Sequence, residues 1–131
     1  MFRYNKNVER RNEIIGMNTK EGIGGIVRFK NLSFDQVKQL MEEKFLNPDD
    51  QQNSAPTCGE FFSLISKHPQ MRAHGYAVTP NREDYRVSIE GVEFRGLITE
   101  EIKDSIIKYE LNDADVFELS IREGYLYCWW D

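Results

Sequence analysis

The sequence predicts an α+β fold: a two-layer arrangement in which a mostly antiparallel sheet of about five strands carries three helices, packed mainly on one face. Three helix-capping signals and several segments of alternating apolar and polar residues support this prediction. The chain of 131 residues also has the commonest size of one domain. We therefore expect a single α+β domain over residues 23–131, with residues 1–22 as a basic lead-in packed on it.

The helices are predicted from their first turns. Ser33 and Gln36 form a capping box, and apolar residues recur at helical spacing through about residue 46. Thr57 and Glu60 form a second box for a helix that His68-Pro69 ends. Thr99 caps a third helix that ends near residue 112. The polar segment 47–56 between the first two helices reads as a surface loop.

Alternation predicts the strands, which fall at residues 22–30, 72–78, 85–89, 92–95, 116–121 and 125–130. Glu90-Gly91 leaves two alternatives: a tight hairpin between two strands, or a glycine bulge within one longer strand. The glycines at 22–25 do not indicate a phosphate loop, because they precede a strand instead of opening a helix.

Composition limits the setting of the protein. The chain is 40% hydrophobic and 30% charged, which suits a globular domain, and it has no apolar run long enough for a membrane span. Its two cysteines, Cys58 and Cys128, do not make a disulfide framework, so we expect reduced thiols, a cytoplasmic location and no membrane partner.

Charge is distributed unevenly along the chain. Residues 1–30 contain seven basic and three acidic groups, a formal charge of +4, while residues 31–131 contain ten basic and nineteen acidic groups, a charge of −9. The basic lead-in can fold back on the acidic body or reach a separate anionic partner. The acidic body favours a basic protein partner and argues against nucleic acid.

The last predicted strand carries a stripe of large aromatic residues. Alternation places Tyr125, Tyr127 and Trp129 on one face and Leu126, Cys128 and Trp130 on the other. If helices cover one face only, the stripe lies open and offers rigid contact area to a partner or a second copy of the chain. The alternatives are burial within the monomer and stacking of nucleobases. Tyr76 and His74 share a face of an earlier strand and join the stripe as candidate binding residues.

A thiol enzyme is the catalytic alternative. Cys58 follows the helix cap Thr57, where the helix dipole favours a thiolate, and His74 is the base that geometry leaves open, with Glu60 as the nearby carboxylate. An inert thiol and a structural histidine are the simpler readings. With neither a close histidine pair nor a CxxC motif, we expect no metal and no cofactor.

Part of the chain resembles small bacterial proteins of no known activity. The segments that carry the resemblance are His74–Glu93, the helix start at Pro56–Phe61 and the terminal Trp-Trp-Asp, within residues 56–131. The resemblance implies a bacterial origin and assigns no function.

Together these patterns favour a small non-catalytic protein-interaction domain, of the inhibitor or immunity type, that binds a basic partner. The alternatives are a cysteine-dependent hydrolase using Cys58 and His74, and a ligand-sensing or self-associating module whose aromatic strand forms a homodimer.

Overall fold

A computed structural model describes residues 2–17, 25–51, 55–111 and 116–130. In chain order the elements are α1 (Val8–Ile15), β1 (Ile26–Leu32), α2 (Phe34–Glu42), α3 (Cys58–Lys67), β2 (Arg72–Val78), β3 (Val87–Arg95), α4 (Glu100–Leu111), β4 (Val116–Arg122) and β5 (Tyr125–Trp130). The strands form one sheet in the order β1-β2-β3-β5-β4, and every neighbouring pair is antiparallel. The predicted α+β fold class is therefore confirmed.

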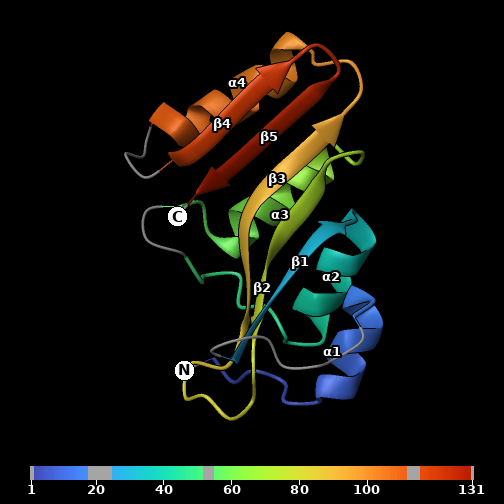
Figure 1. Cartoon of the computed structure of the whole chain (residues 1–131), viewed down its shortest axis with the longest axis vertical. Coiled ribbons are helices and arrows are strands. Elements are labelled where there is room, and N and C mark those ends of the chain that lie inside the picture. Colours follow the sequence, from blue (N-terminus) through green and yellow to red (C-terminus); the bar gives the residue numbers. More distant parts are fainter. Residues whose placement is uncertain (1, 18–24, 52–54, 112–115, 131) are drawn as a thin grey trace.

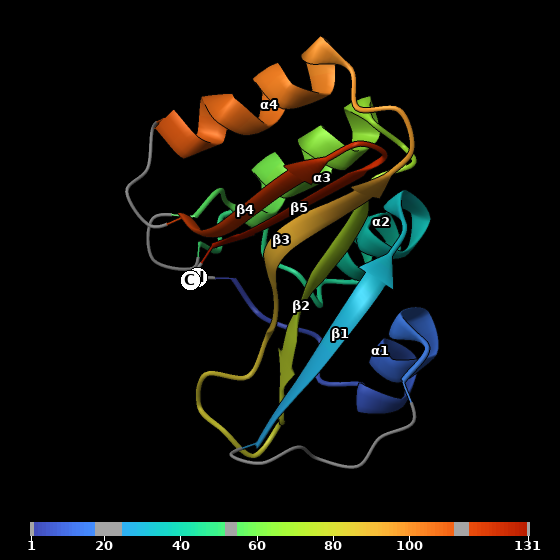
Figure 2. The same ribbon diagram turned by 45° about the horizontal axis from the view of Figure 1, so that its top comes forward.

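The helices lie on one face of the sheet, as Figures 1 and 2 show. α3 packs on β2 and β3, α2 packs on α3, and α1 packs on α2. α4 is tied to the end of α3 by a hydrogen bond between His68 Nε2 and Ser105 Oγ (3.1 Å). The core between helices and sheet includes the fully buried Phe61 and Trp130, whose rings meet edge to face at 5.5 Å.

The capping signals correctly locate the helix starts. At α2, Ser33 Oγ accepts a hydrogen bond from Gln36 N (3.3 Å), while Gln36 Oε1 accepts one from Ser33 N (2.9 Å). Thr57 and Glu60 form the same reciprocal pair at α3. Thr99 Oγ1 accepts a hydrogen bond from Ile102 N at α4 (3.2 Å). Each bond satisfies a backbone N–H that the helix itself leaves without a partner.

Strand β3 decides between the two alternatives for Glu90-Gly91. His74 pairs with Gly91 and Gly75 pairs with Ile89, so Glu90 is the extra residue of a bulge within one strand, and the hairpin alternative is wrong. A Cβ at residue 91 would stand 2.0 Å from the carbonyl oxygen of Cys128. Only glycine lets β5 approach β3 this closely.

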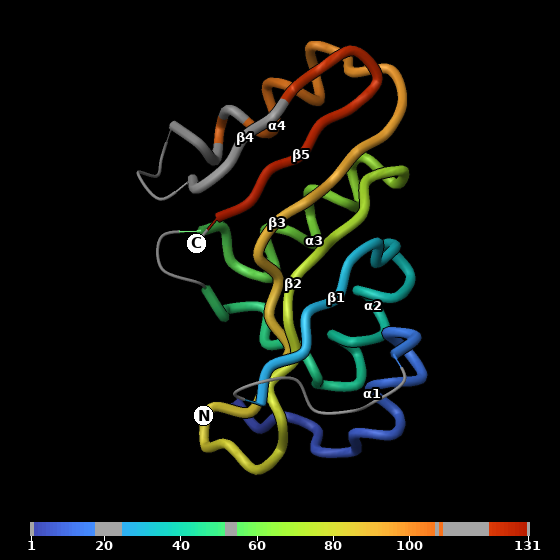
Figure 3. The backbone as a smooth tube through the Cα atoms, viewed as in Figure 1, coloured from blue at the N-terminus to red at the C-terminus, as the bar shows by residue number. Residues whose placement is uncertain are grey.

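The N-terminal segment lies on the domain, with its first described residues beside the β2–β3 loop (Figure 3). Tyr85 Oη donates a hydrogen bond to the Asn5 carbonyl (2.6 Å), and Arg10 forms a bidentate ion pair with Glu43 (2.8 Å). Arg11 is buried and donates to the Val78 carbonyl (3.1 Å). The segment includes α1, which makes four helices in the described part of the chain where the sequence predicted three. The expected strand start at residues 22–24 lies outside the described residues.

Replacing Ser33 with Ala tests the cap of α2. The change removes the acceptor for Gln36 N, so we expect the free energy of unfolding to fall by about 1 kcal/mol in denaturant titrations. Ser63→Ala is the matched control, because Ser63 is exposed within α3, where alanine is the better helix former. Equal stability of Ser33→Ala and the wild-type protein would contradict the cap.

Candidate functional site

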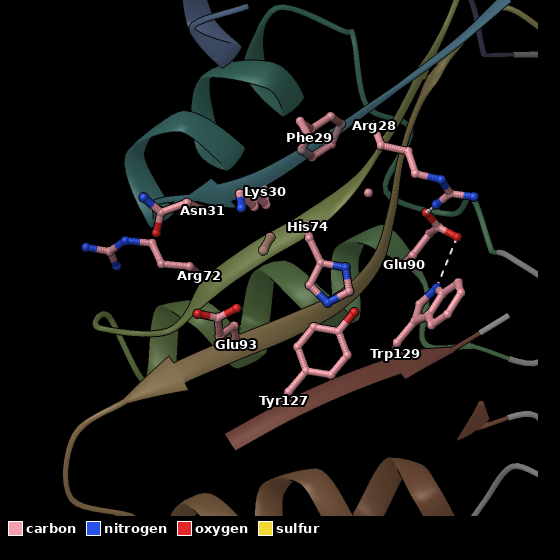
Figure 4. A pocket seen from close by; sticks show the side chains of 12 residues that line it. Arg28, Phe29, Lys30, Asn31, Arg72, His74, Glu90, Glu93, Tyr127 and Trp129 are labelled. Carbon is pink, nitrogen blue, oxygen red and sulfur yellow. Dashed lines mark hydrogen bonds and ion pairs between the residues drawn. The ribbon is translucent and has the colours of Figure 1, made fainter. Parts of the chain in front are cut away.

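The sheet face opposite the helices contains a cavity of about 470 Å³. Its walls come from β1, β2, β3 and β5, and its size is typical of a ligand pocket. Figure 4 shows Arg28, Glu90 and Trp129 at one end and Arg72 and Glu93 toward the other. His74 and Tyr127 lie between these ends (Figure 4).

The middle of the cavity is built around Gly91. His74 on β2 and Trp129 on β5 both pair with this glycine, so the row of side chains across the sheet has a gap between them. The His74 ring occupies the gap, since a Cβ at residue 91 would meet its Cε1 at 2.5 Å. The ring also stacks on Tyr127, with centroids 5.0 Å apart and an interplanar angle of 3°.

His74 is held in its neutral form. Burial lowers its pKa to about 4, against smaller opposing effects of the Cys128 carbonyl and Glu93. Its Nε2 is buried and has no hydrogen-bond partner among the described residues. At neutral pH the imidazole is therefore an uncharged, flat wall of the cavity.

At one end of the cavity, the charged and polar side chains of the lining are paired with one another. The side chain of Glu90 is only 3% exposed, and its carboxylate forms an ion pair with Arg28. Its second oxygen accepts a hydrogen bond from Trp129 Nε1 (3.2 Å). The bulge places Glu90 between these partners, so its buried charge is compensated and the Trp129 indole is fixed in orientation.

Cations without an acidic partner mark the other end. Lys30 and Arg72 form no ion pair with any described residue, although Arg72 donates hydrogen bonds to the carbonyls of Pro69 and Met71. The nearby Glu93 carboxylate is paired with Arg95 (2.9 Å). This end therefore presents positive charge that the described part of the molecule does not neutralise.

The aromatic stripe predicted from the last strand lies on this open face. Tyr125, Tyr127 and Trp129 are each half-buried. Tyr127 is stacked on His74, and the guanidinium groups of Arg95 and Arg122 lie 4.9 and 5.6 Å from the centre of the Tyr125 ring. The rings of the stripe are therefore in contact with an imidazole and two guanidinium groups.

Tyr76, the other predicted binding residue, is buried to 5% exposure and does not line the cavity. Its hydroxyl accepts a hydrogen bond from Arg86 Nη2 (2.7 Å), and the Arg86 guanidinium also lies over its ring. Tyr76 therefore positions Arg86.

The structure does not bring the predicted thiol site together. Cys58 is 1% exposed in the core on the helical side, whereas His74 lines the cavity on the opposite face. Burial raises the pKa of the Cys58 thiol to about 12, outweighing the lowering by a backbone hydrogen bond at Ile89 and by the charge of Arg86. Glu60 is exposed and serves the cap of α3. Cys58 and Cys128 are both free thiols.

Sequence reasoning missed most of the charged lining, namely Arg28, Lys30, Arg72, Glu90, Glu93 and Arg95. The alternation of Arg28 and Lys30 with Val27 and Phe29 did place these two cations on one face of the first strand. The signal that was lacking is the strand order, which sets β1 and β2 beside β3 and β5.

The pKa of His74 predicts a pH-dependent stability. In the unfolded state His74 has a pKa near 6.5, whereas in the folded state its pKa is about 4. Between these values only the unfolded state binds the proton, so the free energy of unfolding falls as the pH is lowered through this window. We expect the wild-type protein to lose on the order of 1–2 kcal/mol more than His74→Gln between about pH 7 and about pH 5. His68 is present in both proteins and cancels. Denaturant titrations with the same pH dependence for both proteins would exclude this role.

Burial of Cys58 predicts slow chemistry at its thiol. Because the thiol is protonated and inaccessible in the folded protein, iodoacetamide should label Cys58 only after denaturant is added. Mass spectrometry of the alkylated peptides measures this directly. Rapid labelling of Cys58 in the native protein at neutral pH would contradict this prediction and show that its thiol is reactive.

Among the described residues no three or more His, Cys, Asp and Glu side chains group as a metal would require, and no helix is long and apolar enough to span a bilayer. No protein-family model, curated protein or solved structure matches this chain. Function must therefore be inferred from the chain's own residues.

Proposed function

We propose that this chain is a non-catalytic protein-interaction domain that binds its partner on the helix-free face of the sheet. The observation that carries the proposal is the cavity on this face, whose lining is fixed at one end and, at the other, carries cations with no acidic partner among the described residues. Fixed aromatic side chains, here Tyr127 and Trp129, beside cations that lack an acidic partner among the described residues are typical of a surface that a partner protein covers.

The lining argues against catalysis. The cavity contains no Cys, Ser or Thr among its described lining residues, and Glu90 is occupied by Arg28 and Trp129. The Nε2 of His74 is buried, so it is poorly placed to exchange a proton with a substrate. The buried Cys58 lies on the other side of the sheet.

The charges of the site favour an acidic rather than a basic partner group. The charge of −9 over residues 31–131 led us to expect a basic partner, but such a sum says nothing about where the charges lie on the surface. On this face Glu90 and Glu93 are already paired, while Lys30 and Arg72 have no acidic partner among the described residues. An inhibitor or immunity role accommodates either sign of charge.

Capture of a partner by the wild-type protein and by variants of the stripe tests the proposal. The immobilised protein is incubated with extract of its source cells, and bound proteins are identified by native mass spectrometry. We expect Tyr127→Ala with Trp129→Ala to lose a partner that the wild-type protein retains, because the floor of the cavity is removed.

Leu97→Ala is the matched control, since Leu97 is 82% exposed and does not line the cavity. Variants are compared only after circular dichroism shows native secondary structure. A partner held equally by all three proteins binds elsewhere, which would overturn the proposal. Capture of a second copy of the chain alone would replace it with self-association.

A further inference from the structure

We propose that a groove across the helix-free face, containing the cavity, binds an extended acidic peptide segment of the protein partner. This inference rests on the proposed function and adds the chemistry of what is recognised. Three observations support it: the hollows that make up the groove are adjacent, their lining carries net positive charge, and the arginines among them are held in place.

Three adjacent hollows make up the groove. The main cavity of about 470 Å³ shares Asn31, Arg72 and Glu93 with a hollow of about 200 Å³. That hollow shares Arg95 with a third, of about 430 Å³, at the β4–β5 turn. The three hollows therefore lie in a row from β1 to the last hairpin, divided by the side chains that they share, and Figure 4 shows the first of them. Such a path suits an extended chain rather than a compact ligand.

The groove is positively charged although the protein is acidic. Its basic lining residues are Arg28, Lys30, Arg72, Arg95 and Arg122. Its acidic ones are Glu90, Glu93 and Glu123. Five basic and three acidic groups give the groove a formal charge of +2. Because the whole chain carries −5, the residues outside the groove carry −7. An acidic segment is attracted to the groove and repelled by the remaining surface, which fixes where it docks.

Three of these cations are available to a partner. Arg28 and Arg95 are paired with Glu90 and Glu93, whereas Lys30, Arg72 and Arg122 form no ion pair within the described part of the chain. Lys30 and Arg122 are exposed, and Arg72 is half-buried. A carboxylate beside each would gain charge-assisted hydrogen bonds without breaking an existing ion pair.

The arginines are positioned before any partner arrives. Arg95 and Arg122 lie against the Tyr125 ring, and Arg72 is held by two backbone carbonyls. A guanidinium fixed in this way presents its planar fork to a carboxylate at a smaller cost in side-chain entropy.

The aromatic rings favour a peptide over single-stranded nucleic acid. Nucleobase binding needs exposed ring faces on which successive bases stack. Here His74 covers one face of Tyr127, and two arginines lie against Tyr125. The rings hold other side chains in place, while the cations carry the recognition.

Fluorescence anisotropy with defined probes tests the inference at low and high salt. The probes are a labelled peptide of alternating Glu and Ser, a peptide of equal length with Lys in place of Glu, and a thymidine oligonucleotide of equal length. The full-length protein should bind the Glu peptide most tightly, and added salt should weaken this binding.

Charge-reversal variants locate the binding. Lys30→Glu and Arg72→Glu should each weaken binding of the Glu peptide about tenfold. Lys67→Glu, an exposed position on α3, makes the same change in net charge and should leave the affinity unchanged. Equal weakening by all three variants would show a non-specific charge effect and overturn the inference.

The other outcomes are equally decisive. No binding of the Glu peptide, or tighter binding of the Lys peptide, would overturn the inference. Tighter binding of the oligonucleotide, lost in Lys30→Glu and Arg72→Glu, would assign the groove to nucleic acid instead. A captured partner that depends on Tyr127 and Trp129 but not on Lys30 or Arg72 would leave the proposed function intact while excluding acidic recognition.

Discussion

The close approach of β5 to β3 at Gly91 is the constraint on which the open face depends. The carbonyl oxygen of Cys128 lies only 2.0 Å from the position that a Cβ at residue 91 would take. The bulge that accompanies this glycine turns Glu90 toward Arg28 and Trp129, and the missing side chain leaves room for the His74 ring. One local departure from regular pairing thus sets both the fixed end of the cavity and its middle.

Pairing of charges divides this face into two parts. Where Glu90 is buried, the protein supplies its own cation and hydrogen-bond donor, because an isolated buried carboxylate would be costly. Lys30 and Arg122 are exposed, and Arg72 is half-buried with two backbone carbonyls as acceptors, so these cations need no carboxylate of the protein's own. The paired part keeps the surface rigid, while the cations without an acidic partner among the described residues are able to accept a partner's carboxylates. A chain with a net charge of −5 therefore presents a cationic groove.

Local signals made much of the fold predictable. Ser33, Thr57 and Thr99 fix helix starts through bonds to residues three positions away, and the alternation in the last hairpin identifies β5. The candidate site was harder to predict from the sequence, because it joins residues from four strands, and the order of these strands depends on long-range contacts. The stripe of Tyr125, Tyr127 and Trp129 was visible, but its cationic neighbours were not. The residues of the Cys58 hypothesis are not brought together, because the start of α3, which was expected to favour a thiolate, places Cys58 in the buried core.

The central claim is that the helix-free face, and not the helical layer, recognises an acidic partner segment. Backbone amide shifts in two-dimensional ¹H–¹⁵N NMR spectra, followed during titration with the alternating Glu and Ser peptide, test it most directly. The account predicts that the largest changes fall around Lys30, Arg72 and Arg95, on strands β1, β2 and β3. Changes concentrated on α1, α2, α3 or α4, with these strands unaffected, would contradict it.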